Sequence, residues 1–481
     1  HEFYHNLNGS EVTGATPFEF WLNEAVTVFN EQIYSGFVLG DEYERLSNIA
    51  SITDPQSGIL VMDKSPAAMP IEPIGFNTPD ELVTSITYIK SPEVVRMVET
   101  MMGKEQFVEA LELYHTRYKH SNATSDQWFE CMTEVSGIDF THFMNTWIRQ
   151  KGHPKVTATR SDGKLTITQS DFGEKPYQFP LVYAVFDKDG KKTKEDMQVI
   201  SDSQTVLDIP DDVGFVSLNR NFGAFITLDY EQSDEELYAQ ARQDDDIFNS
   251  NNALNKLFAK ERVSMLQGTT DEMSAQLVEL YGEIFFNDVL QEKVGVYHIA
   301  IDDTVPQEFL HKYQDLYDVR EKMFTQIARQ FAQKFEQLYD ALAKKEYFGS
   351  LIEKRIAALK DRMVKNTCLG VLARLDTPEI QEKVKKQFLT AINASDKLTS
   401  FTLYMKSSAS DREKILRMYE NEAKDNLVAW EAFLVGVARN PAEDSLKFIK
   451  EIENSQNFRL TQANDQRALF SVFAGVKRKS L

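Results

Sequence analysis

The first five residues of the chain spell the pattern HExxH, in which two histidines stand four positions apart and a glutamate directly follows the first. On a helix, positions i and i+4 project from one face about 6 Å apart, so His1 and His5 can bind a single Zn²⁺ ion while Glu2 points toward the open coordination position. Glu24, further along the chain, offers a third ligand. Two imidazoles and a later carboxylate predict a hydrolytic zinc site.

Two helices joined by a short connection would bring these ligands together. The Asn8-Gly9 pair predicts that the first helix ends one turn after the second histidine, and residues 21–35 form the pattern of an amphipathic helix that ends at Gly36. Because the connection is short, the second helix can return Glu24 to the two histidines. The alternative is a surface helix whose histidine pair is merely solvated.

The expected chemistry follows from the ligand set. Three protein ligands leave the fourth zinc position for water, whose pKa falls to about 7, and the metal polarises a carbonyl group as a Lewis acid. Glu2 is too close along the helix to be a comfortable ligand, so we expect it to be the general base and then the proton donor to a leaving amine. The oxyanion still needs a hydrogen-bond donor, and a phenol would serve because it adds no charge.

Several further segments accompany this site. Together the matching segments are His1–Asn6 (HEFYHN), Trp21–Glu24 (WLNE), Thr87–Lys90 (TYIK), Glu93–Met97 (EVVRM) and Gly103. In this combination the chain resembles the bacterial alanyl aminopeptidase (aminopeptidase N) family of zinc exopeptidases, and the similarity continues more faintly to the end of the chain. In that family the tyrosine of the Tyr-x-Lys stretch faces the zinc across the substrate, so the resemblance implies that Tyr88 donates the hydrogen bond to the oxyanion.

The residues alone favour another interpretation of Tyr88, as a core aromatic ahead of a helix that has Ser91 as its N-cap and Gly103 just after its end. The chain also departs from the family at two positions. Ala25 stands where a glycine is usual, and Val83 stands where bacterial relatives often place an aromatic side chain that lines the first specificity pocket. The side chain preferred in the substrate is therefore left open.

The family's Gly-x-Met-Glu-Asn segment, which precedes HExxH and binds the free amine of the substrate, has no counterpart in residues 1–481. We expect the chain, which begins at a zinc ligand without an initiator methionine, to be part of a longer polypeptide. The resemblance implies an aminopeptidase with one Zn²⁺ per chain that acts on peptides with a free N-terminus. Two alternatives stay open: a thermolysin-type zinc endopeptidase, and a catalytically incomplete metal-binding fragment that acts as an interaction scaffold.

The composition is that of a large soluble enzyme. The chain has 481 residues, 42% of them hydrophobic and 26% charged, which is enough for several domains. Its formal net charge of −21 argues against nucleic acid and anionic membranes as partners, because both would repel it. We interpret the acidic run at residues 243–246 as a solvated face. The sequence leaves the oligomeric state open, and we expect a monomer.

The cysteines have neither metal-ligand spacing nor a disulfide framework. Cys131 lies in a helical pattern and Cys368 is far from it in the sequence, so we expect a buried free thiol at Cys131. No run approaches eighteen apolar residues, which argues against a membrane-spanning helix. Low cysteine usage and the resemblance predict a cytoplasmic protein.

One further carboxylate could support the zinc site. Glu31 lies seven residues after Glu24 on the same helical face and could hydrogen-bond the outer nitrogen of a zinc-binding histidine, although a solvated surface carboxylate is an equally good interpretation. The other histidines have no convergent spacing with acidic or sulfur ligands, so we expect no second metal site. They are His115, His120, His142, His153, His298 and His311.

The periodicity changes twice, which predicts a multidomain, mainly α-helical protein. Residues 1–152 are mostly helical, and by the resemblance they form the helical part of a thermolysin-like zinc peptidase catalytic domain. Residues 153–233 alternate with period two around Asp-Gly turns, which predicts a small antiparallel, Ig-like β-sandwich. Residues 234–481 contain successive amphipathic stretches, which predict an α-helical superhelical domain of the solenoid type.

Overall fold

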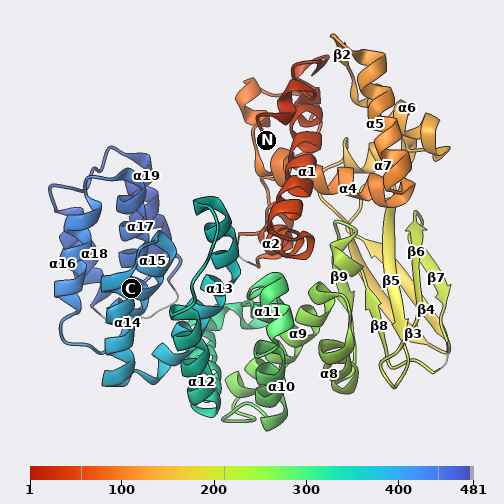
Figure 1. Ribbon diagram of the computed structural model, residues 1–481. Helices are drawn as coiled ribbons and strands as arrows, with labels where there is room; N and C mark the ends of the chain where they lie inside the picture. Colours follow the sequence, from red (N-terminus) through yellow and green to blue (C-terminus); the bar gives the residue numbers. More distant parts are fainter. Residues whose placement is uncertain (56, 211, 443, 477–481) are drawn as a thin grey trace. The chain divides into compact units, whose positions relative to one another are not determined.

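The structure is a computed structural model that describes residues 1–476 except residues 56, 211 and 443. The chain divides into two compact units (Figure 1), and each of them buries its own set of large apolar side chains. The first unit comprises residues 1–257 and 297–303, and the second comprises residues 258–296 and the chain from residue 304 onward. The last five residues of the predicted domain 234–481 lie outside the described residues.

Helices dominate the start of the first unit, as predicted. They are η1 (Tyr4–Asn6), η2 (Pro17–Glu19), α1 (Phe20–Leu39), α2 (Asp41–Thr53), α3 (Ile59–Met62), η3 (Pro79–Leu82), η4 (Ile86–Lys90), α4 (Ser91–Met102), α5 (Lys104–Tyr118), α6 (Ser125–Ser136) and α7 (Thr141–Trp147). Among these, η4 is a π-helical turn that continues directly into α4. The short strands β1 (Val12–Gly14) and β2 (Ser121–Ala123) pair in parallel and join the start of the chain to the region after α5.

Helix α1 continues past its predicted end. Gly36 lies inside the helix, and the chain turns only at Gly40, whose φ is 106° and whose N–H donates to the carbonyl oxygen of Gly36 (2.7 Å). A Cβ atom at Gly36 would lie 2.7 Å from Oδ1 of Asp41, the first residue of α2. The predicted end at Gly36 is therefore wrong, because this glycine permits the close approach of α2 and does not terminate α1.

An aromatic core shared with α5 and α6 holds α1 in place. The ring of Trp21 meets that of Trp128 edge-on, with 5.9 Å between the ring centroids. Phe29, two turns further along α1, meets Phe107 in the same way at 5.7 Å. Burying a phenylalanine contributes about 1.5–3 kcal/mol. Because Glu24 lies between Trp21 and Phe29, this core fixes the position of its backbone.

Two stacked sheets form the predicted β-sandwich (Figure 1). The strands are β3 (Lys155–Ser161), β4 (Lys164–Ser170), β5 (Phe179–Phe186), β6 (Lys192–Ile200), β7 (Gln204–Asp208), β8 (Phe215–Leu218) and β9 (Thr227–Tyr230), in the orders β7-β4-β3-β9 and β6-β5-β8. The prediction of a purely antiparallel sandwich is wrong for one pair, since β3 and β9 run parallel. The chain reaches β9 by crossing over from the other sheet, and such a crossover permits parallel pairing.

A buried ion pair joins α2 and α4 to the turn after β8. The guanidinium group of Arg45 binds both carboxylate oxygens of Glu93, at 2.7 and 2.8 Å, and the two side chains are 6% and 3% exposed. Arg45 also donates to the carbonyl oxygens of Asn221 (3.1 Å) and Phe222 (2.9 Å). These two residues lie in η5 (Arg220–Phe222) and have positive φ values of 54° and 49°. The arginine therefore ties a left-handed turn of the sandwich to the helical part of the first unit.

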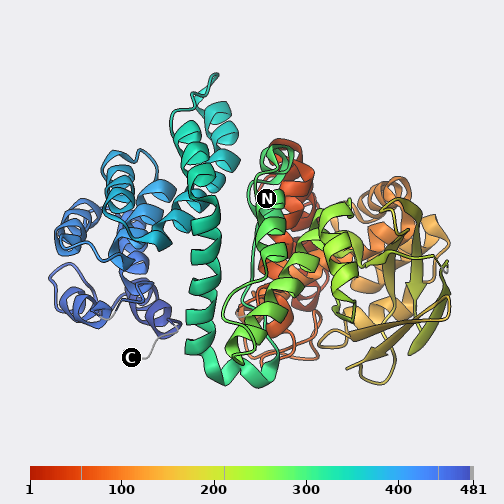
Figure 2. The same cartoon turned by 90° about the horizontal axis from the view of Figure 1, so that it is seen from below.

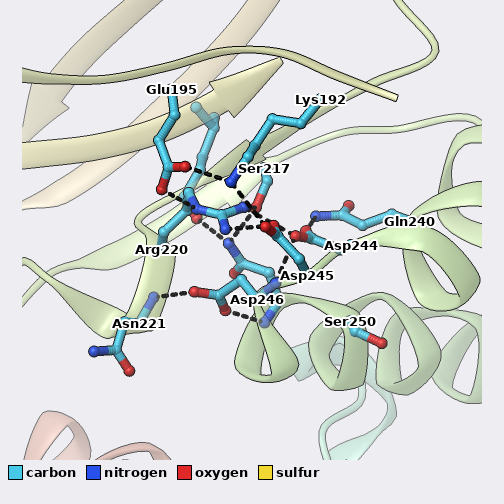
Figure 3. A network of polar contacts seen from close by, with 12 residues as sticks. Lys192, Glu195, Ser217, Arg220, Asn221, Gln240, Asp244, Asp245, Asp246 and Ser250 are labelled. Carbon is cyan, nitrogen blue, oxygen red and sulfur yellow. Dashed lines mark hydrogen bonds and ion pairs between the residues drawn. The ribbon is translucent and has the colours of Figure 1, made fainter. Parts of the chain in front are cut away.

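A second polar network, drawn in Figure 3, ties the sandwich to the corner between α8 (Asp234–Gln243) and α9 (Ile247–Leu266). The guanidinium group of Arg220 contacts Oδ1 of Asp244 (3.0 Å) and Oδ1 of Asp245 (2.6 Å), and the side chain of Asp244 is fully buried. Asp246 accepts the backbone N–H of Asn221 (2.6 Å). Our interpretation of residues 243–246 as a solvated face is therefore wrong for Asp244, which is buried and paired.

The second unit is helical throughout its named elements, and it begins within α9. The elements are α10 (Ala275–Phe285), α11 (Asp288–Val294), η7 (Gln307–Lys312), α12 (Tyr313–Ala343), α13 (Leu351–Leu372), η8 (Ala373–Leu375), α14 (Pro378–Thr390), α15 (Ala394–Lys406), α16 (Arg412–Ala423), α17 (Leu427–Ala438), α18 (Ser445–Glu453), α19 (Ala463–Gln466), η9 (Arg467–Ser471) and α20 (Val472–Ala474). The long helix α12 packs against α13 (Figure 2), and α14 packs against α15. Within the described ranges, no helix is both long and apolar enough to span a membrane.

We expect Arg220→Met to lower the free energy of unfolding by about 3–5 kcal/mol, because the buried carboxylate of Asp244 would lose its partner charge. Urea denaturation of the full chain followed by circular dichroism measures this change. Lys188→Met is the matched control, since Lys188 pairs with Asp212 at an exposed site where such pairs contribute about 0–1 kcal/mol. Equal losses in the two variants would contradict a structural role for the buried network.

Candidate metal centre

His1 and His5 lie on the first turn of the chain. The backbone N–H of His5 donates to the carbonyl oxygen of His1 (3.3 Å), and the turn continues as η1. Gly9, whose φ is 118°, follows this turn and donates its N–H to the carbonyl oxygen of Val12 (2.8 Å). The predicted first helix is thus only a short 3-10 turn that ends at Asn6, before the predicted end at Asn8-Gly9.

Three potential ligand atoms converge on one point. The Nε2 atoms of His1 and His5 are 3.1 Å apart, and Oε2 of Glu24 lies 3.3 Å from the first and 3.5 Å from the second. Among the residues that the structure describes, these three form the one group of His, Cys, Asp or Glu side chains whose ligand atoms lie within 4.8 Å of one another. The structure therefore brings together the three side chains that the sequence analysis selected.

The outer nitrogens of both imidazoles face hydrogen-bond acceptors. Nδ1 of His1 lies 2.8 Å from Oε2 of Glu31, and Nδ1 of His5 lies 2.9 Å from the carbonyl oxygen of Asn8. With its Nδ1–H donating to these acceptors, each ring would present the lone pair of Nε2 toward the other ring and toward Glu24, as a metal-binding imidazole does. The Glu31 contact is one that the sequence analysis anticipated, whereas the carbonyl group of Asn8 was missed.

The geometry and chemistry of this donor set fit Zn²⁺. Two nitrogen lone pairs and a carboxylate oxygen face one another, an arrangement that is repulsive unless a cation lies among them. Oε2 of Glu24 is buried and has no hydrogen-bond partner in the described part of the chain. In a tetrahedral site with bonds of 2.0–2.1 Å, ligand atoms are about 3.3–3.4 Å apart, close to the separations found here.

The pKa of Glu24 reflects its burial among these other electron-pair donors. Burial raises the pKa of its carboxyl group above the usual value, while the charge of His5 and a hydrogen bond from Tyr88 act in the opposite direction. The charge of Glu2 raises it further. A divalent cation would reverse the effect of burial, because it is the largest local charge in such a site and favours the ionised carboxylate.

Tyr88 lies beside this group, on the π-helical turn η4. Its ring stacks 6.4 Å from that of His1. Burial, followed by the charge of Glu24, raises the pKa of the phenol. The alternative interpretation of Tyr88 as a core aromatic is wrong, because its side chain is only half-buried and Ser91 is not an N-cap: α4 follows η4 without a break.

Glu2 is exposed, and its negative charge acts on both Glu24 and Tyr88. This charge contributes to the raised pKa values of both side chains. The two positions that depart from the family pattern have different surroundings. Ala25 is fully buried in α1, and Val83, just before η4, is 55% exposed.

Comparison with known proteins agrees with this geometry. Residues 1–147 match the peptidase family M1 domain, and residues 234–479 match a domain of unknown function built from ARM repeats (DUF3458_C). The ARM-repeat match agrees with the predicted solenoid type of the C-terminal helices. It covers more than half of the chain.

The matching relatives are longer than this chain. Aminopeptidase N of Escherichia coli K12 is 27% identical over 99% of this chain and 57% of its own length, and aminopeptidase N of Haemophilus influenzae is 24% identical over 100% and 57%. The crystal structure of Legionella pneumophila aminopeptidase A in complex with aspartic acid has the same fold, with a TM-score of 0.83. The match covers 98% of this chain and 56% of that chain, and the two sequences are 20% identical. The chain thus spans somewhat over half the length of these relatives. It belongs to the aminopeptidase N family of M1 peptidases.

Proposed function

We propose that this chain carries the zinc centre of an aminopeptidase that hydrolyses the N-terminal peptide bond of peptides. The observation that carries the proposal is the convergence of lone-pair atoms from His1, His5 and Glu24 within 3.5 Å of one another. The names of the related proteins support an exopeptidase over an endopeptidase. One Zn²⁺ ion per chain and a peptide with a free N-terminus are parts of this proposal.

The residues around the centre have separate roles in the proposed hydrolysis. A Zn²⁺ ion bound by the three ligands would act as a Lewis acid and lower the pKa of a bound water to about 7. Glu2 accepts the proton of the attacking water and passes it to the leaving amine nitrogen. The hydroxyl group of Tyr88 donates a hydrogen bond to the oxyanion, and its raised pKa keeps it protonated at neutral pH.

The same proposal extends to the domains. We infer that residues 1–152 form the helical part of a thermolysin-like catalytic domain and that residues 153–233 form an Ig-like sandwich. We infer also that residues 234–481 form a superhelical domain, which the ARM-repeat match supports.

Glu2→Gln tests the assignment of the general base. We expect turnover of alanine p-nitroanilide to fall by at least about 10²-fold while one zinc ion stays bound per chain, because the amide cannot accept the proton. Hydrolysis is followed by absorbance, and bound zinc is measured by atomic absorption. Glu112→Gln, at an exposed position of α5, is the matched control and should leave both quantities unchanged.

Different outcomes separate the competing functions. Full activity of Glu2→Gln would remove this mechanism. Cleavage of amino-terminally blocked peptides by the unaltered chain would favour a thermolysin-type endopeptidase. A chain that binds one zinc ion and cleaves neither kind of substrate would indicate a metal-binding scaffold.

Tyr88→Phe tests the oxyanion donor. We expect kcat to fall by roughly 10²-fold or more with little change in KM, because the hydrogen bond would be made only as the oxyanion develops. Steady-state kinetics on the same substrate measure both constants. Tyr34→Phe on the exposed face of α1 is the control. A rise in KM at constant kcat would instead indicate that Tyr88 binds the substrate in its ground state.

Glu31→Gln tests the outer contact to His1. Loss of the carboxylate 2.8 Å from Nδ1 should weaken zinc binding by about 10–100-fold, because such partners orient the ligand and raise its basicity. Competition with a chromogenic zinc chelator measures the affinity. Glu44→Gln is the control. Glu44 is close enough to Glu31 for the charge of Glu31 to raise its pKa, but its side chain binds Asn48 and no histidine. Unchanged affinity in Glu31→Gln would make Glu31 a solvated carboxylate.

A further inference from the structure

A fully buried ion pair lies at the end of the turn that carries Tyr88. Nζ of Lys90 lies 3.0 Å from each carboxylate oxygen of Asp63 and 2.7 Å from the carbonyl oxygen of Gly152, and neither charged side chain is exposed. These three acceptors match the three protons of the ammonium group. Burying an isolated ammonium group would cost several kcal/mol, so the site is built to hold this charge.

The ion pair extends into the β-sandwich. Oδ2 of Asp63 also contacts Nδ1 of His153 (2.9 Å), whose Nε2 lies 3.0 Å from Oγ1 of Thr227. Asp63 directly follows α3, His153 precedes β3, and Thr227 is the first residue of β9. The network therefore fixes Lys90 against three segments that are distant from it in the sequence.

The turn itself has a conformation that needs support. In an α-helix each residue advances by about 100° around the axis, and a π-helical turn accommodates one extra residue. If η4 relaxed to the α-helical form, the side chains before Lys90 would rotate by about 100° relative to α4. Local hydrogen bonds also pin the turn: Oγ1 of Thr87 donates to the carbonyl oxygen of Leu82 (2.6 Å), and Oγ of Ser91 donates to that of Ile86 (2.9 Å).

We propose that Lys90 is a positioning residue, whose buried ion pair with Asp63 keeps η4 in the π-helical form and thereby directs the hydroxyl group of Tyr88 toward His1 and Glu24. This inference rests on the proposed function only for its catalytic consequence. The orientation of Tyr88 itself can be measured without turnover. Hydrogen-bond networks of this kind hold functional groups within about 0.5 Å of their working position.

The test uses the full chain, loaded with Zn²⁺ and labelled with [¹³Cζ]tyrosine. The resonance of Tyr88 is identified by its loss in Tyr88→Phe. Lys90→Met removes the charge, and Lys90→Met combined with Asp63→Asn avoids leaving a carboxylate unpaired, which protects the fold. Lys64→Met is the matched control, because Lys64 pairs with Asp171 at a largely exposed site next to Asp63.

We expect the Tyr88 resonance in the double variant to move to the position of a solvent-exposed tyrosine, while zinc affinity and the control spectrum stay unchanged. In an active chain, kcat should fall by about 10²-fold at constant KM, and adding Tyr88→Phe should cause no further loss. An unshifted Tyr88 resonance in a folded double variant would overturn the proposal and leave the ion pair a purely structural role. Absence of turnover in the unaltered chain would count against the proposed function, but the resonance would still decide the role of Lys90.

Discussion

The first unit has to hold three electron-pair donors close together although they repel one another. The two Nε2 atoms and the Glu24 carboxylate oxygen lie 3.1–3.5 Å apart, and the contacts to Glu31 and to the Asn8 carbonyl group place the imidazole protons on the far side. A metal ion would relieve the repulsion, but the chain must create the arrangement through its own packing. The aromatic anchors of α1 and the tight turn at Gly9 provide this constraint, so the site depends on elements that do not touch the metal position.

Much of the site could be predicted because short sequence patterns identify most of its residues. The HExxH spacing selects His1 and His5, and a helical period links Glu24 to Glu31 within α1. The carbonyl group of Asn8 could not be selected in this way, since every residue has one and only the turn geometry decides where it points. The Lys90–Asp63–His153 network was missed for a different reason. Its members are separated by 27 and 90 positions, and no local pattern connects them.

The fold shows the same division between local and distant information. Helical periodicity and Asp-Gly turns predicted the order of helical, β-sandwich and helical segments. Gly36 was misread because a glycine that ends a helix and one that permits close packing look alike in a sequence. Strand β6 carries a weaker signal than the core strands, because an edge strand with mostly polar, half-exposed residues lacks their apolar alternation. The parallel pairing of β3 with β9 depends on a crossover between sheets, which no short segment encodes.

Buried charge gives this unit a kind of specificity that apolar packing does not. Apolar contacts tolerate small shifts, whereas a buried ion pair at 2.7–3.0 Å loses most of its stabilisation if either partner is displaced. Arg45–Glu93, Lys90–Asp63 and Arg220–Asp244 each join segments that the chain brings together from different elements. Such pairs contribute little net stability compared with an apolar core, but they fix one register among several. For Tyr88, whose hydroxyl group we propose as the oxyanion donor, a fixed register matters more than the last few kcal/mol of stability, because such a donor has to be held within about 0.5 Å of its working position.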